Sequence, residues 1–368
     1  MRARVLPIYT RAPRAPTLLL LALAALAGCR GPRVPAATDL PRALAPDTVS
    51  VRPENVRRAL QALAHDSMEG RATATPGMFR AARYLAEQFR AIGLEAVGDS
   101  GYFQRVPLAW QPRPGGGRRP VLLASWEAWN GQPEERRALG LNVVGVLRGT
   151  DLAEQAVLID AHYDHLGVGR PVAGDDLYNG ADDDASGVVA VVEIARALAA
   201  GPRPKRTVVF LLTCGEELGL LGTRWYIERP VVNLERTVAN LEIEMIGRPD
   251  PLAGGPGRAW LTGYERSSMG ESLAAAGIPI VPDPRPTENF FERSDNIAFA
   301  RMGIPAHTLS SFNLHADYHR PSDEDDTIDY RHLTSVVRAA VRAARLLADG
   351  PVPVWKPGGQ PAAAEPRP

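Results

Sequence analysis

The sequence contains few residues of several types, and each shortage excludes a class of protein. Only two cysteines, Cys29 and Cys214, occur among 368 residues, so a disulfide framework is excluded. The 42 basic residues are balanced by 42 acidic ones, and this neutral balance argues against nucleic acid as the main partner. Lysine is almost absent, since only Lys205 and Lys356 occur, and we attribute this to compositional bias and not to function.

Long apolar runs are also scarce, and the clearest one lies near the N-terminus. Residues 18–27 follow four arginines and are too few to span a bilayer comfortably, so we interpret them as a signal-peptide core. The run ends in Leu-Ala-Gly-Cys, which resembles a bacterial lipobox. We therefore expect a signal peptide over residues 1–28 and a lipid anchor at Cys29. This anchor predicts a membrane-attached protein of the bacterial cell envelope, facing the periplasm or the outside.

Composition divides the mature chain into a tether, a large domain and a tail. Residues 29–50 and 350–368 are rich in Pro and Ala, and we expect a flexible tether and a disordered tail there. Residues 51–349 alternate strand and helix patterns, which predicts an α/β fold with a mostly parallel, twisted central sheet and helices on both faces. The expected strands cover residues 105–110, 141–147, 156–161, 207–213, 238–243, 259–262 and 304–309, and the expected helices residues 56–63, 78–92, 185–200, 218–228, 268–276 and 327–348.

Acidic residues and histidines gather where four of these strands end. They are His162 and Asp164 after 156–161, Glu216 and Glu217 after 207–213, Glu242 and Glu244 at the end of 238–243, and His315 and His319 after 304–309. Because ligands bind at the carboxyl ends of strands in such sheets, we expect the clusters to converge on one edge. Imidazole and carboxylate together suit zinc, and a carboxylate between two sites can bridge two ions. The pattern predicts a divalent metal site that hydrolyses an amide.

Two runs of adjacent acids need a further explanation. The aspartates at 182–184 lie between glycines, just before the expected helix at 185–200, where three like charges require a structural reason or a ligand. Glu216 and Glu217 would repel each other unless a cation holds at least one of them. We interpret one of these glutamates as a metal ligand and the other as a general base.

In this order the motifs resemble those of peptidase family M28, the zinc aminopeptidases with co-catalytic ions. The resemblance covers roughly residues 53–348 and rests on His162-x-Asp164, Gly-Ala-Asp-Asp-Asp-Ala-Ser-Gly from residue 180, Glu-Glu-Leu-Gly-Leu-Leu-Gly from residue 216, and Tyr318-His319. Shorter supporting strings are Met68-Glu69-Gly70-Arg71 and Ser294-Asp295. The resemblance implies the zinc-exopeptidase form of the fold, two Zn²⁺ ions or other divalent metals, and peptide substrates with a free N-terminus.

Carried over by position, the resemblance implies five metal ligands. They are His162 and Glu244 on the first zinc, Glu217 and His319 on the second, and Asp183 as the bridge between them. The family usually has Asp where this chain has Glu244, and Glu242 lies two residues earlier. Both glutamates stay open as the ligand, with Glu244 favoured because it aligns with the family position.

The resemblance also implies the residues that carry the reaction. Glu216 would be the general base, Tyr318 would donate a hydrogen bond to the tetrahedral oxyanion, and Asp164 would orient the ring of His162. A cis peptide bond is expected after the bridging aspartate, between Asp183 and Asp184.

Other polar residues receive less specific interpretations. His165 either shapes the substrate pocket or lies on the surface, and His315 is the less favoured of the two late histidines. We expect His307 to be structural and the acidic run at 323–326 to be solvated before the last helix.

The leading prediction is a di-zinc metallo-aminopeptidase at the cell envelope. Alternatives on the same fold are an acyltransferase of the glutaminyl cyclase kind and a carboxypeptidase, and a different class is a non-catalytic, lipid-anchored binding relative. Fold similarity does not decide among them. A candidate for every ligand is present, which favours the hydrolase.

Overall fold

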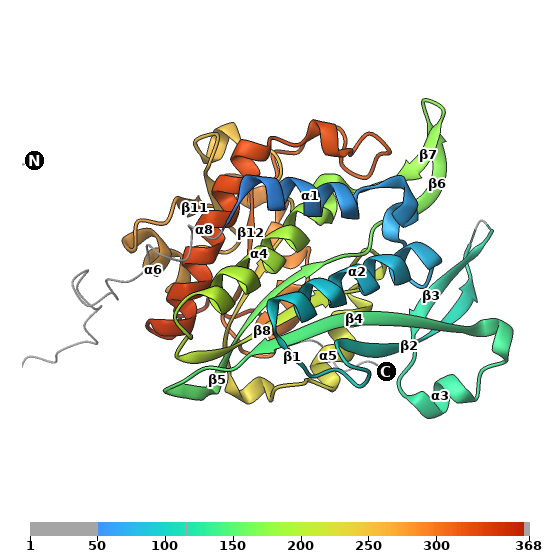
Figure 1. Cartoon of the computed structure of the whole chain (residues 1–368), viewed down its shortest axis with the longest axis horizontal. Coiled ribbons are helices and arrows are strands. Elements are labelled where there is room, and N and C mark those ends of the chain that lie inside the picture. Colours follow the sequence, from blue (N-terminus) through green and yellow to red (C-terminus); the bar gives the residue numbers. More distant parts are fainter. Residues whose placement is uncertain (1–50, 115, 364–368) are drawn as a thin grey trace, which may run out of the picture. The chain divides into compact units, whose positions relative to one another are not determined.

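The computed structural model describes residues 51–114 and 116–363, in which strands and helices alternate (Figure 1). The strands are β1 (Glu95–Ala96), β2 (Phe103–Pro112), β3 (Arg118–Leu122), β4 (Arg137–Leu147), β5 (Leu152–His162), β6 (Gly167–Val172), β7 (Asp175–Tyr178), β8 (Arg206–Thr213), β9 (Thr237–Ile243), β10 (Ala259–Leu261), β11 (Ile280–Pro282) and β12 (Ala306–Ser310). The helices are α1 (Pro53–Leu63), α2 (Pro76–Ile92), α3 (Trp126–Asn130), α4 (Gly187–Ala200), α5 (Leu221–Glu228), α6 (Met269–Ala275), α7 (Asn296–Arg301) and α8 (Tyr330–Asp349). Three short helical turns matter below: η3 (Asp66–Arg71), η5 (Ala181–Ser186) and η6 (Glu216–Leu218).

All strands except β6 and β7 form one mixed sheet in the described residues. Its order is β11-β10-β12-β9-β5-β8-β4-β2-β3, with β1 paired to β4. The central neighbours β12, β9, β5 and β8 are parallel, whereas β4, β2 and β3 are antiparallel to their neighbours. The predicted α/β fold with a parallel centre is confirmed, and the antiparallel flank is an addition that the sequence patterns did not predict.

Side chains of the central strands alternate between two cores on opposite faces of the sheet. In β5, Val157 and Ile159 belong to a core that includes α1, α2, α4 and α8, whereas Ala156 and Leu158 belong to another that includes α5 and α7. Burial on both faces explains why these strands are apolar along their whole length. The two helical layers therefore hold the carboxyl ends of β5, β8 and β9 on a rigid base.

Local chemistry determines where the long helices begin and end. Thr75 caps α2 by accepting the N–H of Met78, Pro76 occupies the first turn, and the helix stops at Gly93 in the left-handed conformation with φ of 85°. Asp329 caps α8 by accepting two backbone N–H groups. The expected helices at 78–92 and 327–348 match α2 and α8 to within three residues.

The C-terminal segment differs from the disordered tail that composition predicted. Trp355 pairs with Ser267 in an isolated β-bridge, and its indole N–H donates to the carbonyl of Gly303 at 2.9 Å. Lys356 forms an ion pair with Glu271 at 2.6 Å. Because a tryptophan and a lysine find partners on the domain, the segment up to residue 363 is part of the fold.

The remaining domain predictions concern the N-terminus. Residues 1–50, which include Cys29, lie outside the described residues, so the signal peptide, the tether and the lipid anchor stay predictions. Among the described helices, none combines the length and apolar character needed to cross a bilayer.

Candidate metal centre

The carboxyl ends of the central strands bring the predicted ligands together. His162 ends β5, Glu217 lies in η6 after β8, Glu244 follows β9, and His319 lies in the loop after β12. Asp183 reaches them from η5, before α4. Ligand atoms of His162, Asp183 and Glu244 lie within 4.8 Å of one another. We call the five residues of this paragraph the histidine–carboxylate group.

Asp183 occupies the centre of this group because its two oxygens face different histidines. Its Oδ1 lies 3.3 Å from His162 Nε2, and its Oδ2 lies 3.1 Å from His319 Nε2. Glu244 Oε1 is 3.9 Å from the same nitrogen of His162, and Glu217 Oε2 is 3.3 Å from that of His319. Each histidine thus faces Asp183 and one glutamate, as expected for two ions that share a bridging carboxylate.

The donor atoms and their spacing fit zinc. His162 Nε2, Asp183 Oδ2 and Glu217 Oε1 are buried and have no hydrogen-bond partner among the described residues. Since buried polar atoms nearly always have partners, these atoms are available to a ligand. Zinc binds imidazole and carboxylate at about 2.0–2.2 Å, so two ligands of one tetrahedral ion lie roughly 3.3 Å apart. The histidine nitrogens and carboxylate oxygens of the group are separated by 3.1–3.9 Å, which is close to that value.

The three adjacent aspartates have different partners. Asp182 accepts the N–H of Gly247 at 2.7 Å and lies 3.0 Å from the Nε2 of His315. Asp184 accepts two backbone N–H groups, each at 3.0 Å. Only Asp183, of these three, faces the histidines of the group, and the expected cis peptide bond follows it. The outer two aspartates hold the backbone while the middle one is left for a ligand.

The two candidate glutamates of β9 are separated clearly by their surroundings. Glu242 is fully buried away from the group, and four donors saturate its carboxylate. The donors are the hydroxyls of Ser294 and Thr308 and the backbone N–H groups of Asp295 and Asn296. Glu244 is the glutamate that reaches His162 and Asp183. The same contacts turn Ser294 inward, so it does not line the cleft.

Asp164 faces the ring of His162 with its side chain, since its Oδ1 lies 3.9 Å from His162 Nδ1. Its backbone carbonyl, and not its side chain, lies within hydrogen-bond distance of His162 Nδ1, at 3.1 Å. The carboxylate accepts the hydroxyl of Thr73 at 2.8 Å and the N–H of Glu216 at 3.1 Å. Burial raises the pKa of Asp164 to about 6. The side chain therefore positions η6, and with it Glu216.

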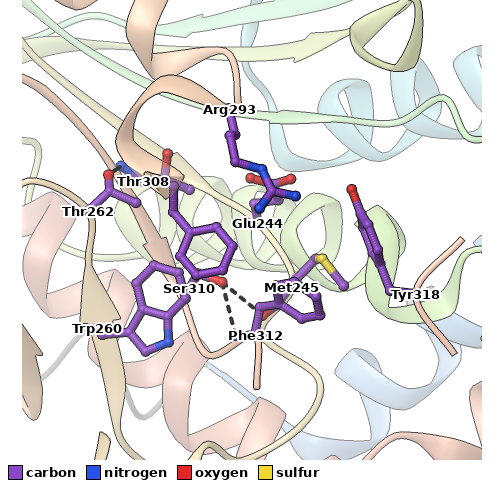
Figure 2. Close-up of a pocket in the computed structure, with 10 residues that line it drawn as sticks. Glu244, Met245, Trp260, Thr262, Arg293, Thr308, Ser310, Phe312 and Tyr318 are labelled. Carbon is purple, nitrogen blue, oxygen red and sulfur yellow. Dashed lines mark hydrogen bonds between the residues drawn. The ribbon is translucent and has the colours of Figure 1, made fainter. Parts of the chain in front are cut away.

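The two predicted catalytic groups flank the histidine–carboxylate group. Burial raises the pKa of Glu216 well above its usual value, and the nearby charge of Glu244 adds to this shift. The ring of Tyr318 stacks on His319 with centroids 3.9 Å apart and lines a pocket together with Glu244 (Figure 2). Burial also raises the pKa of Tyr318, so its hydroxyl stays protonated and able to donate.

The carboxylates of the histidine–carboxylate group raise the pKa of its two histidines, His162 and His319. Burial alone would lower the pKa of His319, but Asp183 and Glu217 raise it to about 10. Burial would raise the pKa of Asp183, but His165, His162 and His319 hold it well below its usual value. Bound metal ions must displace protons from these histidines, so uptake of zinc weakens as the pH falls.

Two polar residues, His165 and Asp323, lie in places that their local sequence did not indicate, and a third, His307, lies as expected. His165, which was left between a pocket and a surface position, is buried, with Nδ1 2.9 Å from Glu217 Oε1. Asp323, expected in solvent, is buried and accepts the N–H groups of Asp182 and Asp183 at 3.0–3.1 Å. His307 is buried between the carbonyl of Thr262 and a hydroxyl, as expected for a structural histidine. Contacts between residues about 140 apart explain why Asp323 was misjudged.

With this geometry established, comparison with known proteins identifies the family. Residues 142–344, more than half of the chain, match the sequence pattern of Peptidase family M28. The chain belongs to peptidase family M28. The prediction of a metallopeptidase of this family is thereby confirmed, and the matched segment contains all five residues of the histidine–carboxylate group.

Individual relatives show what this chain is similar to in sequence and in fold. The vacuolar membrane protease of Colletotrichum graminicola is 29% identical over 216 residues, which are 54% of this chain and 18% of that protein. The chain thus matches less than a fifth of the fungal protein's length. An aminopeptidase from Aneurinibacillus sp. strain AM-1 has a TM-score of 0.59 at 17% identity, covering 84% of this chain and 97% of its own. A zinc aminopeptidase from Bacillus subtilis has a TM-score of 0.60 at 15% identity, covering 81% and 96%. At such identities the two solved structures show the fold alone.

The expected cellular location is wrong. Several curated relatives of this M28 member are fungal proteins named vacuolar membrane protease, which contradicts a bacterial cell envelope. The physical reason is that arginines before a short apolar run are a general targeting pattern, which does not specify the kind of cell.

Arg71 ties the two metal-facing loops of this M28 domain together. Its guanidinium is fully buried and donates to four backbone carbonyls, an arrangement for which lysine has too few rigid donors. The acceptors are Leu63 and Tyr163 at 2.8 Å, Asn179 at 2.6 Å and Gly180 at 2.9 Å. The loop that carries Asp164 and the loop that leads to Asp183 are therefore fixed to each other, which explains the Met68-Glu69-Gly70-Arg71 string.

Proposed function

We propose that this M28 member is a di-zinc aminopeptidase, which hydrolyses the bond after the first residue of a peptide. The observation that carries the proposal is the Asp183 carboxylate, whose oxygens lie 3.3 Å from His162 Nε2 and 3.1 Å from His319 Nε2. A single ion would need only one of these two histidine–glutamate pairs. Two pairs that share one aspartate support two ions.

The chain's own residues would divide the two ions between them. His162, Asp183 and Glu244 would hold one zinc, and Asp183, Glu217 and His319 would hold the other. When bound, the two ions supply Lewis acidity, polarising the substrate carbonyl and lowering the pKa of a water molecule. Other divalent metals are an alternative, because the same ligand types also accept them.

Glu216 and Tyr318 would carry the proton and the charge of the reaction. Glu216 would take a proton from the attacking water and deliver it to the nitrogen of the leaving amine. The N–H that Glu216 donates to Asp164 fixes the start of η6 and so the place from which the side chain acts. Tyr318 would donate its hydroxyl proton in a hydrogen bond to the oxygen that becomes negative in the tetrahedral intermediate.

Hydrolysis of aminoacyl-anilides by the full chain tests this proposal. Each anilide is paired with its N-acetylated form, and zinc per chain is measured before and after dialysis against a chelator. We expect two zinc ions per chain, cleavage of the free-amine substrates alone, and loss of cleavage on chelation with recovery when zinc is added.

Further substrates, offered to the same protein, identify the alternatives. Zinc-loaded protein that cleaves neither set but cyclises N-terminal glutamine would be an acyltransferase of the glutaminyl cyclase kind. Cleavage of blocked peptides from the carboxyl end would make it a carboxypeptidase. A protein without bound metal or turnover would be a binding relative, and the aminopeptidase proposal would be abandoned.

A further inference from the structure

A pocket beside the histidine–carboxylate group carries an inference about the substrate. The pocket opens next to Glu244 and Tyr318 (Figure 2). This position places it where a group on a bound peptide would project from the reacting bond. The character of its walls therefore bears on which peptides the enzyme selects.

Most of the pocket wall is apolar or already bonded. Trp260 stacks on Phe290 with centroids 5.2 Å apart, and Phe312 meets Phe290 edge-on at 5.8 Å. The hydroxyl of Thr308 donates to Glu242 at 2.8 Å, and that of Ser310 lies 3.2 Å from the carbonyl oxygen of Met245. These groups give the pocket shape and an apolar lining, and they leave little polar capacity for a ligand.

Arg293 is the exception, since it is the one basic residue among the described residues that line the pocket. Its guanidinium carbon lies 5.0 Å from the centroid of Phe290, and it forms no ion pair within residues 51–114 and 116–363. By contrast, Arg248 pairs with Asp317 at 2.6 Å, and Arg285 pairs with Asp250. Figure 2 shows the Arg293 side chain extending toward the centre of the lining residues.

A second donor in the same wall is also unsatisfied. The indole Nε1 of Trp260 is buried and has no hydrogen-bond partner in the described part of the chain. A guanidinium and an indole N–H both donate and neither accepts. The complementary ligand is an acceptor, and for the cation it is an anion.

We propose that this pocket selects peptides that present a carboxylate to Arg293. The inference rests on the proposed aminopeptidase function and adds the substrate class. The planar guanidinium, supported on the face of Phe290, binds a carboxylate through two parallel hydrogen bonds. The carboxylate comes either from an acidic side chain of the first residue or from the C-terminus of a short peptide. Glu244 would hold one of the proposed zinc ions, whose charge would offset the repulsion between this glutamate and a bound carboxylate.

Four substrates separate the two sources of the carboxylate. The first pair is the anilide of glutamate against that of glutamine, and the second is the dipeptide Leu-Gly against its C-terminal amide. We expect at least one carboxylate-bearing member to be cleaved with about tenfold or greater advantage in kcat/KM over its neutral partner, because charged hydrogen bonds contribute about 1.5–3 kcal/mol. The pair that shows the advantage identifies the source.

The variant Arg293→Gln then tests the residue. This variant should abolish the kcat/KM advantage of the carboxylate-bearing substrate and leave the kcat/KM of the neutral substrates unchanged. Arg293→Lys should retain part of the advantage. Arg301→Gln removes the same charge from the end of α7, outside the pocket lining, and should behave as the wild type. The proposal is overturned if the wild type shows no advantage in either pair, or if the advantage survives in Arg293→Gln. Failure of the aminopeptidase proposal itself would look different, since neutral anilides would not be cleaved either.

Discussion

Two groups of three carboxylates lie near the carboxyl ends of β5 and β9, and they are built in opposite ways. The histidine–carboxylate group contains Asp183, Glu217 and Glu244, whereas a second group consists of Asp160, Glu242 and Asp295. Asp160 lies two residues before His162 on β5, and Glu242 two residues before Glu244 on β9. On each of these two strands, the earlier residue therefore belongs to the second group and the later one to the histidine–carboxylate group.

The difference lies in what surrounds the oxygens. In the second group, hydroxyl and amide donors surround the carboxylates: four bond Glu242, and the hydroxyls of Thr213 and Thr223 bond Asp295. In the first group, histidines face the carboxylates, and key atoms lack hydrogen-bond donors. Each oxygen of Glu242 accepts two hydrogen bonds and has no lone pair left for a metal ion, whereas Asp183 Oδ2 and Glu217 Oε1 have no hydrogen-bond partner in the described residues. The second group therefore stabilises buried acids with protons and hydrogen bonds, and the first is prepared for cations.

Removal of the bridging carboxylate should have the largest effect. Asp183→Ala takes away a ligand from both ions, so we expect zinc per chain to fall from two toward zero and activity by at least about a thousandfold. Metal analysis after gel filtration and anilide kinetics measure both. The matched change in the second group, Asp160→Asn, should keep both ions. Full zinc occupancy in Asp183→Ala would move the bridge to another residue.

Glu216→Gln should separate metal binding from chemistry. The amide cannot accept a proton from water, so we expect kcat to fall by about 10²–10⁴-fold while two zinc ions stay bound. Glu217→Gln is the adjacent comparison, because it should lose zinc as well as activity. A Glu216→Gln enzyme with near wild-type turnover would show that another group is the base.

The sequence predicted the first group and missed the second, for a physical reason. Parallel strands bring their carboxyl ends to one edge, so residues such as His162 and Glu244 could be placed together from strand patterns alone. Glu242 could not be assigned, because its partners Ser294 and Thr308 lie more than 50 residues away. The burial of His165 and Asp323 and the four contacts of Arg71 depend in the same way on distant loops, which no local pattern reports.

A variant of His165 tests whether this residue also supports the histidine–carboxylate group. Its Nδ1 is 2.9 Å from Glu217 Oε1, and its Nε2 has no hydrogen-bond partner in the described residues. We expect His165→Ala to weaken retention of the second zinc by about 10–100-fold, the usual cost of losing a residue that supports a ligand. Competition with a chromogenic chelator measures the affinity. His315→Gln removes a histidine that contacts Asp182 instead and should leave the affinity unchanged. Equal affinities in both variants would exclude His165 from the zinc site.

The smallest effect should appear in the second group, as a dependence of stability on pH. Burial raises the pKa of Glu242 to about 8, and the charges of Glu244 and Asp295 add to the shift. An unfolded glutamate has a pKa of about 4.3, so between these values the folded state holds a proton that the unfolded state has lost. Stability is therefore greatest below this range and declines as the pH rises through it.

Asp160→Asn removes one titratable carboxyl from this group and keeps an oxygen that can accept the N–H of Asn240. Asp160 Oδ2 has no hydrogen-bond partner in the described residues, and an amide there can donate to a neighbouring carboxylate. Burial and the charges of Glu242 and Asp295 raise the pKa of Asp160 well above its usual value. The free energy of unfolding is measured with urea at pH 5 and at pH 8. We expect it to fall between these pH values by about 1 kcal/mol less in the variant than in the wild type. Asp151→Asn, at an exposed turn, controls for the loss of one charge and should keep the wild-type decline. If the Asp160→Asn decline equals that of the wild type, the second group holds no proton, and its contrast with the metal-facing group would need another explanation.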